Sequence, residues 1–209
     1  LVMSIYFADR SEDSLQFLPV YIVCDESSSM SEASIQEVNV GIVEVFDEIN
    51  ADPIIDAKAR VGIVAFSDTA RVLFPLTQLS DVTQIPYVVA GSGEANFGNL
   101  FRLLTFVVRR DIREMKAQGF GIGVPLILLM TAGHPTDDGW QRAKDKFLSS
   151  VGQARARLVG YGVSGADKSV LAEISHWGSR TGTKYFFMAE DAGSPGAAIK
   201  EIVKFLIAS

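Results

Sequence analysis

Residues 20–30 read Val-Tyr-Ile-Val-Cys-Asp-Glu-Ser-Ser-Ser-Met, an apolar and largely β-branched run that ends in a carboxylate and three hydroxyls. A short run of this kind is typical of a strand that is buried on both faces of a parallel sheet. The polar residues would follow the carboxyl end of that strand, where open α/β sheets bind their ligands. We therefore expect a functional site in the loop that begins at Asp25.

Three side chains of this loop alternate along the chain: Asp25, Ser27 and Ser29. An open loop can turn all three toward one point, and a carboxylate with two hydroxyls offers the oxygen ligands that Mg²⁺ prefers. A local explanation competes with this one, because Ser and Asp are also common helix N-caps. Ser34 and Glu37 form a capping-box pattern ahead of the next helix. The residues by themselves leave both interpretations open.

Strand and helix patterns alternate along the rest of the chain. Apolar runs predict further strands at 60–66, 70–76, 125–131, 157–162 and 183–188. Helical spacing predicts helices at 34–49, 97–116, 140–149 and 167–175, and a last helix capped by Ser194 with Pro195 at its first position. This order predicts an α/β fold: a doubly wound, mostly parallel six-stranded sheet with one antiparallel edge strand (70–76) and helices on both faces. We expect an N-terminal arm over residues 1–17 and a single domain over 18–209.

The composition narrows the range of partners. The chain of 209 residues is 48% apolar and has a net charge of −6, so we expect no nucleic-acid partner. No apolar stretch approaches the length of a membrane span, and we expect no membrane partner. The only cysteine is Cys24, which rules out an intrachain disulfide and fits a reducing compartment, so we expect the cytoplasm.

Three loops on this sheet, at 25–30, 91–97 and 131–138, resemble in order and spacing those of the von Willebrand factor A domain family. The metal-ion-dependent adhesion site of that family opens with Asp-x-Ser-x-Ser, which the loop at residue 25 matches. Further matches are Val-Gly-Ile-Val-Ala-Phe-Ser-Asp at 61–68 and Leu-Met-Thr-Ala-Gly-His-Pro-Thr-Asp at 129–137. The resemblance covers residues 18–207 and implies a Rossmann-like fold. The stretch 129–137 is most similar to bacterial intracellular members, such as those of tellurium-resistance operons.

Two positions depart from the family pattern. The second loop of the family usually offers a threonine where this chain has Ala95, and the third loop usually offers an aspartate where it has Ala132. The resemblance therefore carries only Asp25, Ser27 and Ser29 over as metal ligands. It implies a degenerate site that binds no cofactor or binds Mg²⁺ weakly.

Other carboxylates near these loops could replace a missing ligand. Glu94 is adjacent to Ala95 and is the first candidate, ahead of Asp68 and Asp137. The resemblance also implies a non-enzymatic module that binds a protein partner through the rim formed by these loops. The residues expected to contact that partner are Asp25, Ser27, Ser29, Glu94, Asn96 and His134.

A second motif supports an alternative class of function. Residues 160–165 read Gly-Tyr-Gly-Val-Ser-Gly, which fits G-x-G-x-x-G between a predicted strand and helix, with Glu190 after the next strand. This alternative is a nucleotide-binding or oxidoreductase domain that uses Gly160, Gly162 and Gly165. The motif lies on the penultimate predicted strand, however, and no second βαβαβ half follows it. A Ser27–His134 nucleophile pair is also conceivable, but no G-x-S-x-G elbow surrounds Ser27, so we expect no enzyme.

Overall fold

The computed structural model describes residues 16–133, 135–151, 156–163, 165–177, 186–192, 194–196 and 202. Most of the expected N-terminal arm, His134 and nearly all of the expected last helix lie outside these residues. The strands are β1 (Gln16–Asp25), β2 (Ala59–Phe66), β3 (Ala70–Thr77), β4 (Gly121–Ile122), β5 (Leu126–Thr131), β6 (Arg157–Gly162) and β7 (Phe186–Met188).

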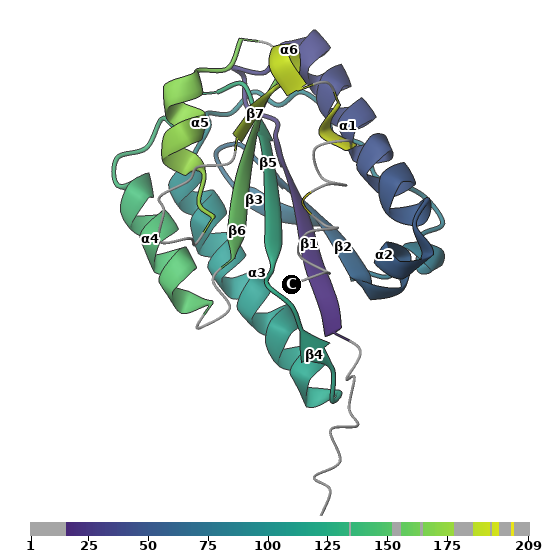
Figure 1. Ribbon diagram of the computed structural model, residues 1–209. Coiled ribbons are helices and arrows are strands. Elements are labelled where there is room, and N and C mark those ends of the chain that lie inside the picture. Colours follow the sequence, from purple (N-terminus) through teal and green to yellow (C-terminus); the bar gives the residue numbers. More distant parts are fainter. Residues whose placement is uncertain are drawn as a thin grey trace, which may run out of the picture.

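The strands form one sheet in the order β3-β2-β1-β5-β6-β7 (Figure 1). All neighbours along this path are parallel except β2 and β3, which pair antiparallel at one edge. The predicted parallel sheet with one antiparallel edge strand is therefore confirmed. A seventh strand was not predicted: the two residues of β4 pair with Gln16 and Phe17 at the start of β1. Two residues are too few to produce a periodic pattern.

Helices cover both faces of the sheet, as predicted (Figure 1). The elements are α1 (Glu32–Asn50), α2 (Pro53–Lys58), the 3₁₀ helix η1 (Leu79–Asp81), α3 (Phe97–Ala117), α4 (Trp140–Ser150), α5 (Lys168–Ile174) and α6 (Ala189–Ala192). The helices α1 and α2 pack on one face, and α3, α4 and α5 pack on the other. None of the helices in the described ranges is both long and apolar enough to cross a membrane.

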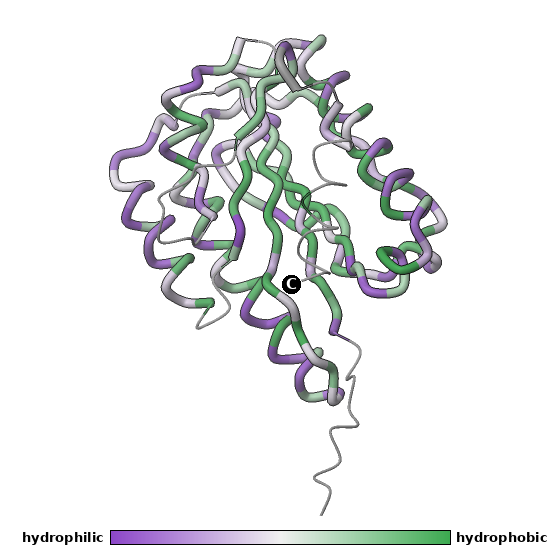
Figure 2. Tube along the Cα trace, viewed as in Figure 1, coloured by the Kyte–Doolittle hydropathy of each residue, from purple (hydrophilic) through white to green (hydrophobic). Residues whose placement is uncertain are grey.

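Side chains of β1 alternate between the two faces of the sheet. Val20, Ile22 and Cys24 belong to the core beneath α1, whereas Tyr21 and Val23 belong to the core beneath α3. This is the period of two that a strand imposes, and burial on both sides explains why residues 20–24 are continuously apolar. Figure 2 shows mostly hydrophobic strands between helices in which hydrophobic and hydrophilic residues alternate.

The start of α1 differs from the prediction. Ser31 is the N-cap, and its hydroxyl accepts a hydrogen bond from the Ser34 N–H at 3.0 Å. The expected capping box of Ser34 and Glu37 is therefore wrong, because Ser34 lies inside the helix as the donor to an earlier cap. The helix α2 was missed, although Asp52 caps it and Pro53 occupies its first turn. That pair is a helix-start signal in the sequence.

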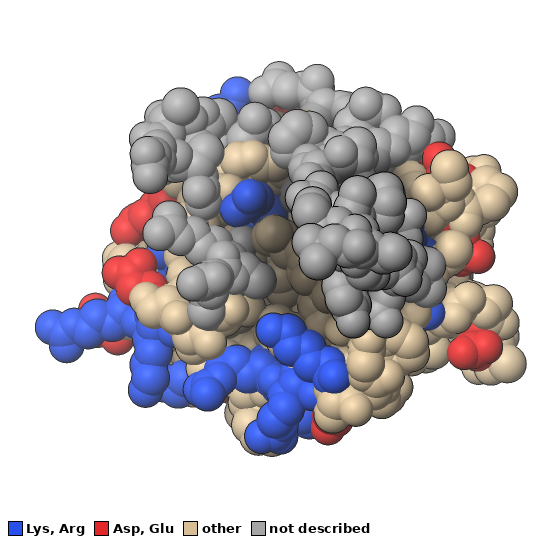
Figure 3. Space-filling model, turned by 60° about the horizontal axis from the view of Figure 1, so that its bottom comes forward, with Lys and Arg blue, Asp and Glu red and all other residues tan. Residues whose placement is uncertain are grey.

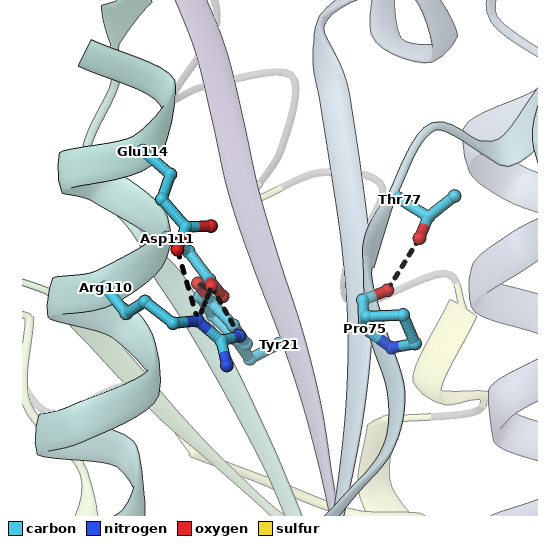
Figure 4. A network of polar contacts seen from close by, with 6 residues as sticks. All are labelled: Tyr21, Pro75, Thr77, Arg110, Asp111 and Glu114. Atoms are coloured by element: carbon cyan, nitrogen blue, oxygen red, sulfur yellow. Dashed lines mark hydrogen bonds and ion pairs between the residues drawn. The ribbon is translucent and has the colours of Figure 1, made fainter. Parts of the chain in front are cut away.

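A buried polar network fixes α3 against the middle of the sheet (Figure 4). The Tyr21 hydroxyl donates to Asp111 Oδ2 at 2.8 Å, and the Arg110 guanidinium donates to Asp111 Oδ1 at 2.7 and 2.9 Å. Tyr21 and Asp111 are both buried. Burial, together with the Asp111 charge, raises the pKa of Tyr21 far above its ordinary value, so its hydroxyl remains a donor.

Candidate functional site

Three loops meet at the carboxyl end of the central strands. They are loop 1 (residues 25–30), loop 2 (91–96) and loop 3 (131–138). The Ser28 N–H in loop 1 donates to the Gly93 carbonyl in loop 2 at 2.7 Å. The Thr136 N–H in loop 3 donates to the Ala95 carbonyl in loop 2 at 3.1 Å. Backbone hydrogen bonds thus join the loops into one connected rim.

Asp25 lies at the end of β1 and is completely buried. Its Oδ1 accepts the Ser27 N–H at 2.9 Å, and its Oδ2 accepts the Thr131 hydroxyl at 2.5 Å. Thr131 is held in turn by the Gly133 N–H, which donates to its hydroxyl at 3.0 Å. Burial raises the pKa of the Asp25 carboxyl, and the hydrogen bonds from Thr131 and Ser27 oppose that rise. Thr131 is a site residue that the sequence interpretation did not single out.

The two serines of loop 1 lie together beside Asp25. Their hydroxyl oxygens are 2.8 Å apart, with Ser27 buried and Ser29 exposed. A Cβ placed on Gly133 would lie 2.5 Å from Ser29 Oγ and 2.9 Å from Asp25 Oδ2. Asp25 and Ser29 therefore converge with loop 3 on one point, and a glycine is required there because any side chain would collide with both.

The two alanines of the rim present methyl groups instead of oxygens. Ala95 is 2% exposed and belongs to the core beneath α3, and its Cβ would lie 3.4 Å from a Cβ on Gly133. Ala132 is half-buried and packs against the core beneath α1. Mg²⁺ requires near-ideal octahedral coordination by oxygen. Where Asp25 and the two serines converge, the described rim offers one carboxylate and a few hydroxyls, so these residues fit a magnesium ion only in part.

The other predicted site residues hold the loops in place. Glu94 is exposed, and its N–H donates to Asp68 Oδ1 at 2.7 Å. The Asn96 side chain caps α3, and the Asp137 carboxylate accepts from an N–H in the first turn of that helix at 3.0 and 3.2 Å. Within the described ranges, no three His, Cys, Asp or Glu side chains are grouped closely enough to hold a metal ion.

An ion pair between a buried glutamate and an exposed arginine ties loop 1 to the edge of the sheet. Glu26 is 5% exposed and pairs through both carboxylate oxygens with Arg71 on β3, one contact being 2.8 Å. The Glu26 carbonyl also accepts the Gly91 N–H of loop 2 at 2.7 Å. The sequence signals only half of this arrangement. A carboxylate next to a strongly apolar run needs a partner, but nothing identifies an arginine 45 residues away.

The G-x-G-x-x-G motif has a packing role. Gly160 and Gly162 lie inside β6, whereas the dinucleotide fingerprint places its first glycine in the turn after the strand. A Cβ on Gly162 would lie 2.5 Å from a methyl carbon of Leu171, so glycine there allows α5 to pack closely on the strand. Gly165 has φ +86°, which glycine adopts without strain in a turn.

A doubly wound sheet whose ligand-binding loops gather at the carboxyl ends of its strands defines a Rossmann-like α/β binding domain. The chain belongs to the von Willebrand factor type A (VWA) domain family, whose sequence profile matches residues 20–204. Domains of this family are in general non-enzymatic modules for protein interaction and adhesion. None of the curated proteins matches the chain significantly.

Solved structures show the same fold at low sequence identity. The SpRpn10 VWA domain is 15% identical with a TM-score of 0.58, and the match covers 88% of this chain and 94% of that one. Proximal thread matrix protein 1 from the mussel byssus is 18% identical with a TM-score of 0.57, covering 92% and 47%. The pilus adhesin SpaC from Lactobacillus rhamnosus GG is 14% identical with a TM-score of 0.64, covering 94% and 30%.

Proposed function

We propose that this domain is a non-enzymatic module that binds a protein partner through its rim, with a degenerate metal site. The rim residues of this proposal are Asp25, Ser27, Ser29, Glu94, Asn96 and His134. Asp25 and Ser27 are buried, so their role is to hold the exposed Ser29 in place for the partner. The proposal includes the cytoplasm as its location and the bacterial intracellular members as its nearest group. The observation that carries it is the exposed Ser29 hydroxyl, which stands beside the buried Asp25 carboxylate on a rim connected by backbone hydrogen bonds.

Direct hydrogen bonding is the proposed mode of recognition. A metal at this rim would supply positive charge that could attract an acidic side chain of a partner. Ala95 and Ala132 remove two of the oxygens that would hold it, so Mg²⁺ binds weakly or is absent. The partner then contacts the Ser29 hydroxyl and the exposed Glu94 carboxylate directly. The rigidity of loop 1, held by Asp25 and by Glu26, reduces the entropy lost on binding.

Affinity capture from the native host tests the proposal. The domain is used as bait beside the Ser29→Ala variant, which removes one exposed rim hydroxyl. Ser149→Ala is the matched control, because Ser149 is an exposed serine on α4, far from the rim loops. We expect a partner that the wild type and the control capture and that Ser29→Ala loses. Retention of every partner by Ser29→Ala and Glu94→Gln would refute the rim as the binding surface.

Two assays distinguish the competing classes of function. Steady turnover of an ester, phosphoester or peptide that Ser27→Ala abolishes would establish a hydrolase. Calorimetric titration with NAD, NADP and ATP addresses the nucleotide alternative, and we expect no binding. Micromolar binding of any one of the three nucleotides would contradict this expectation.

A further inference from the structure

Charge is distributed unequally between the two faces of the sheet. Residues 32–58, which form α1 and α2, contain seven Asp or Glu and one Lys. The helices α3 and α4 together contain eight Lys or Arg and three Asp or Glu. Blue Lys and Arg side chains gather along the lower left of the view in Figure 3, over α3 and α4. A chain with a net charge of −6 thus carries a concentrated positive surface.

The positive surface is organised around an exposed aromatic ring. We define the basic face as Arg102, Phe106, Arg109 and Arg113 on α3 with Arg142 and Lys146 on α4, all of which are exposed. The four residues of α3 recur at i, i+4, i+7 and i+11 and so share one side of the helix. Phe106 is 66% exposed between these arginines. Phenylalanine and arginine are both enriched at protein interfaces, so an exposed phenylalanine among arginines favours a docking surface.

The opposite surface is its chemical complement. We define the acidic face as Glu32, Val40, Val43 and Asp47 on α1 with Ile54 on α2, all of which are exposed. The helix α1 has no Lys or Arg along its 19 residues. Val40 is 57% exposed and Ile54 is 64% exposed, so this face also has apolar groups among its charges.

We propose that the occupant of the basic face is a second copy of this chain, which docks through its acidic face. A two-fold contact would place either face against itself and bring like charges together, which costs free energy. A head-to-tail contact instead pairs Arg109 and Arg113 with Asp47 and covers Phe106 with Val40 and Val43. Because the two faces lie on opposite sides of the sheet, each copy keeps one face free, and the contact can repeat.

The strength of this contact depends on charges that are exposed to solvent. Individual surface ion pairs contribute little, and salt screens them, so the association is weak and salt-sensitive. The rim loops lie at the carboxyl ends of the central strands and are not part of either face. Self-association and partner binding at the rim can therefore be tested separately, and failure of one does not imply failure of the other.

Sedimentation velocity over a range of concentrations tests the proposal on the whole chain. We expect the average mass of the wild type to rise with concentration at about 0.1 M salt, where the Debye length is about 10 Å, and to return to the monomer at about 1 M. The basic-face variant Arg109→Glu/Arg113→Glu and the acidic-face variant Val43→Lys/Asp47→Lys each present two like faces. We expect each to be monomeric alone and a mixture of the two to regain association.

The mixture separates loss of the contact from loss of the fold, because a misfolded variant could not restore association. Arg109→Gln/Arg113→Gln is the milder version and should weaken association without adding repulsion. Glu94→Lys/Asp138→Lys changes charge on the rim by a similar amount and should leave self-association intact. A wild type that stays monomeric at all concentrations, or a mixture that fails to associate, overturns the proposal. Binding of duplex DNA to the basic face of a protein that stays monomeric would also overturn the proposal.

Discussion

Replacing Thr131 by valine tests whether the buried carboxylate of the rim depends on protein donors. The substitution keeps the shape of the side chain but removes the hydroxyl that donates to Asp25 Oδ2 at 2.5 Å and accepts from the Gly133 N–H. A hydrogen bond to a charged group contributes about 1.5–3 kcal/mol, and a buried N–H left unpaired costs about 1 kcal/mol or more. We expect the free energy of unfolding to fall by about 2–4 kcal/mol and the Tm by roughly 5–15 °C.

Urea denaturation followed by circular dichroism measures this change, with an unchanged m value as evidence that the unfolded state is not affected. Thr105→Val is the matched control, because that hydroxyl donates to a helix carbonyl, Phe101 O, at 2.7 Å and serves no buried charge. We expect the control to change stability by less than about 0.5 kcal/mol. In an Asp25→Asn background, Thr131→Val should lower the free energy of unfolding by less, because the acceptor is then neutral. Equal costs in both backgrounds would refute the reasoning.

Three other outcomes follow from the site and the core. Added Mg²⁺ at a concentration near its Kd should raise the free energy of unfolding by only about 0.4 kcal/mol. The double variant Ala95→Thr/Ala132→Asp should show a clearly larger Mg²⁺-dependent rise in Tm. If the rise is no larger, these two positions are not the missing ligand positions. As the pH rises from about 4, the wild type should lose stability relative to Asp25→Asn. Burial raises the folded-state pKa of Asp25, so its ionisation opposes folding, and asparagine has no such ionisation. Urea titrations at several pH values measure the difference in the free energy of unfolding. The Cys24 thiol is fully buried and its pKa is raised by burial, so iodoacetamide should label it only in denaturant, as mass spectrometry will show.

The sequence predicts the sheet well because burial on both faces leaves a continuous apolar signal. The strands β1 and β5 are buried along nearly their whole length, and each was found within a few residues. The strand β4 left no signal, because two residues have no period. The start of α1 was misplaced for a different reason: Ser31 and Ser34 are both acceptable caps, and only the geometry of the preceding loop selects between them.

The candidate site was predictable only where its residues are close together in the chain. Asp25, Ser27 and Ser29 form a local motif, and their proximity follows from the loop. The donor Thr131 and the partner Arg71 reach the site from 106 and 45 residues away. Such pairings depend on strand order and on which face a side chain takes, and no local pattern encodes them. Resemblance to the family located loop 3 but did not identify its threonine as the group that holds Asp25.

The hydrogen bond between Tyr21 and Asp111 restricts how this domain can change shape. Helices in switching proteins can slide past their neighbours by one turn, about 5.4 Å. Such a slide of α3 would remove Asp111 from its phenolic donor and leave a buried carboxylate poorly satisfied, so the helix is locked in axial position. The register between β1 and the arginines of α3 is therefore held by a buried contact. A change in the loop at Asp25, four residues beyond Tyr21, could shift those arginines by a helix turn only at the cost of breaking that contact.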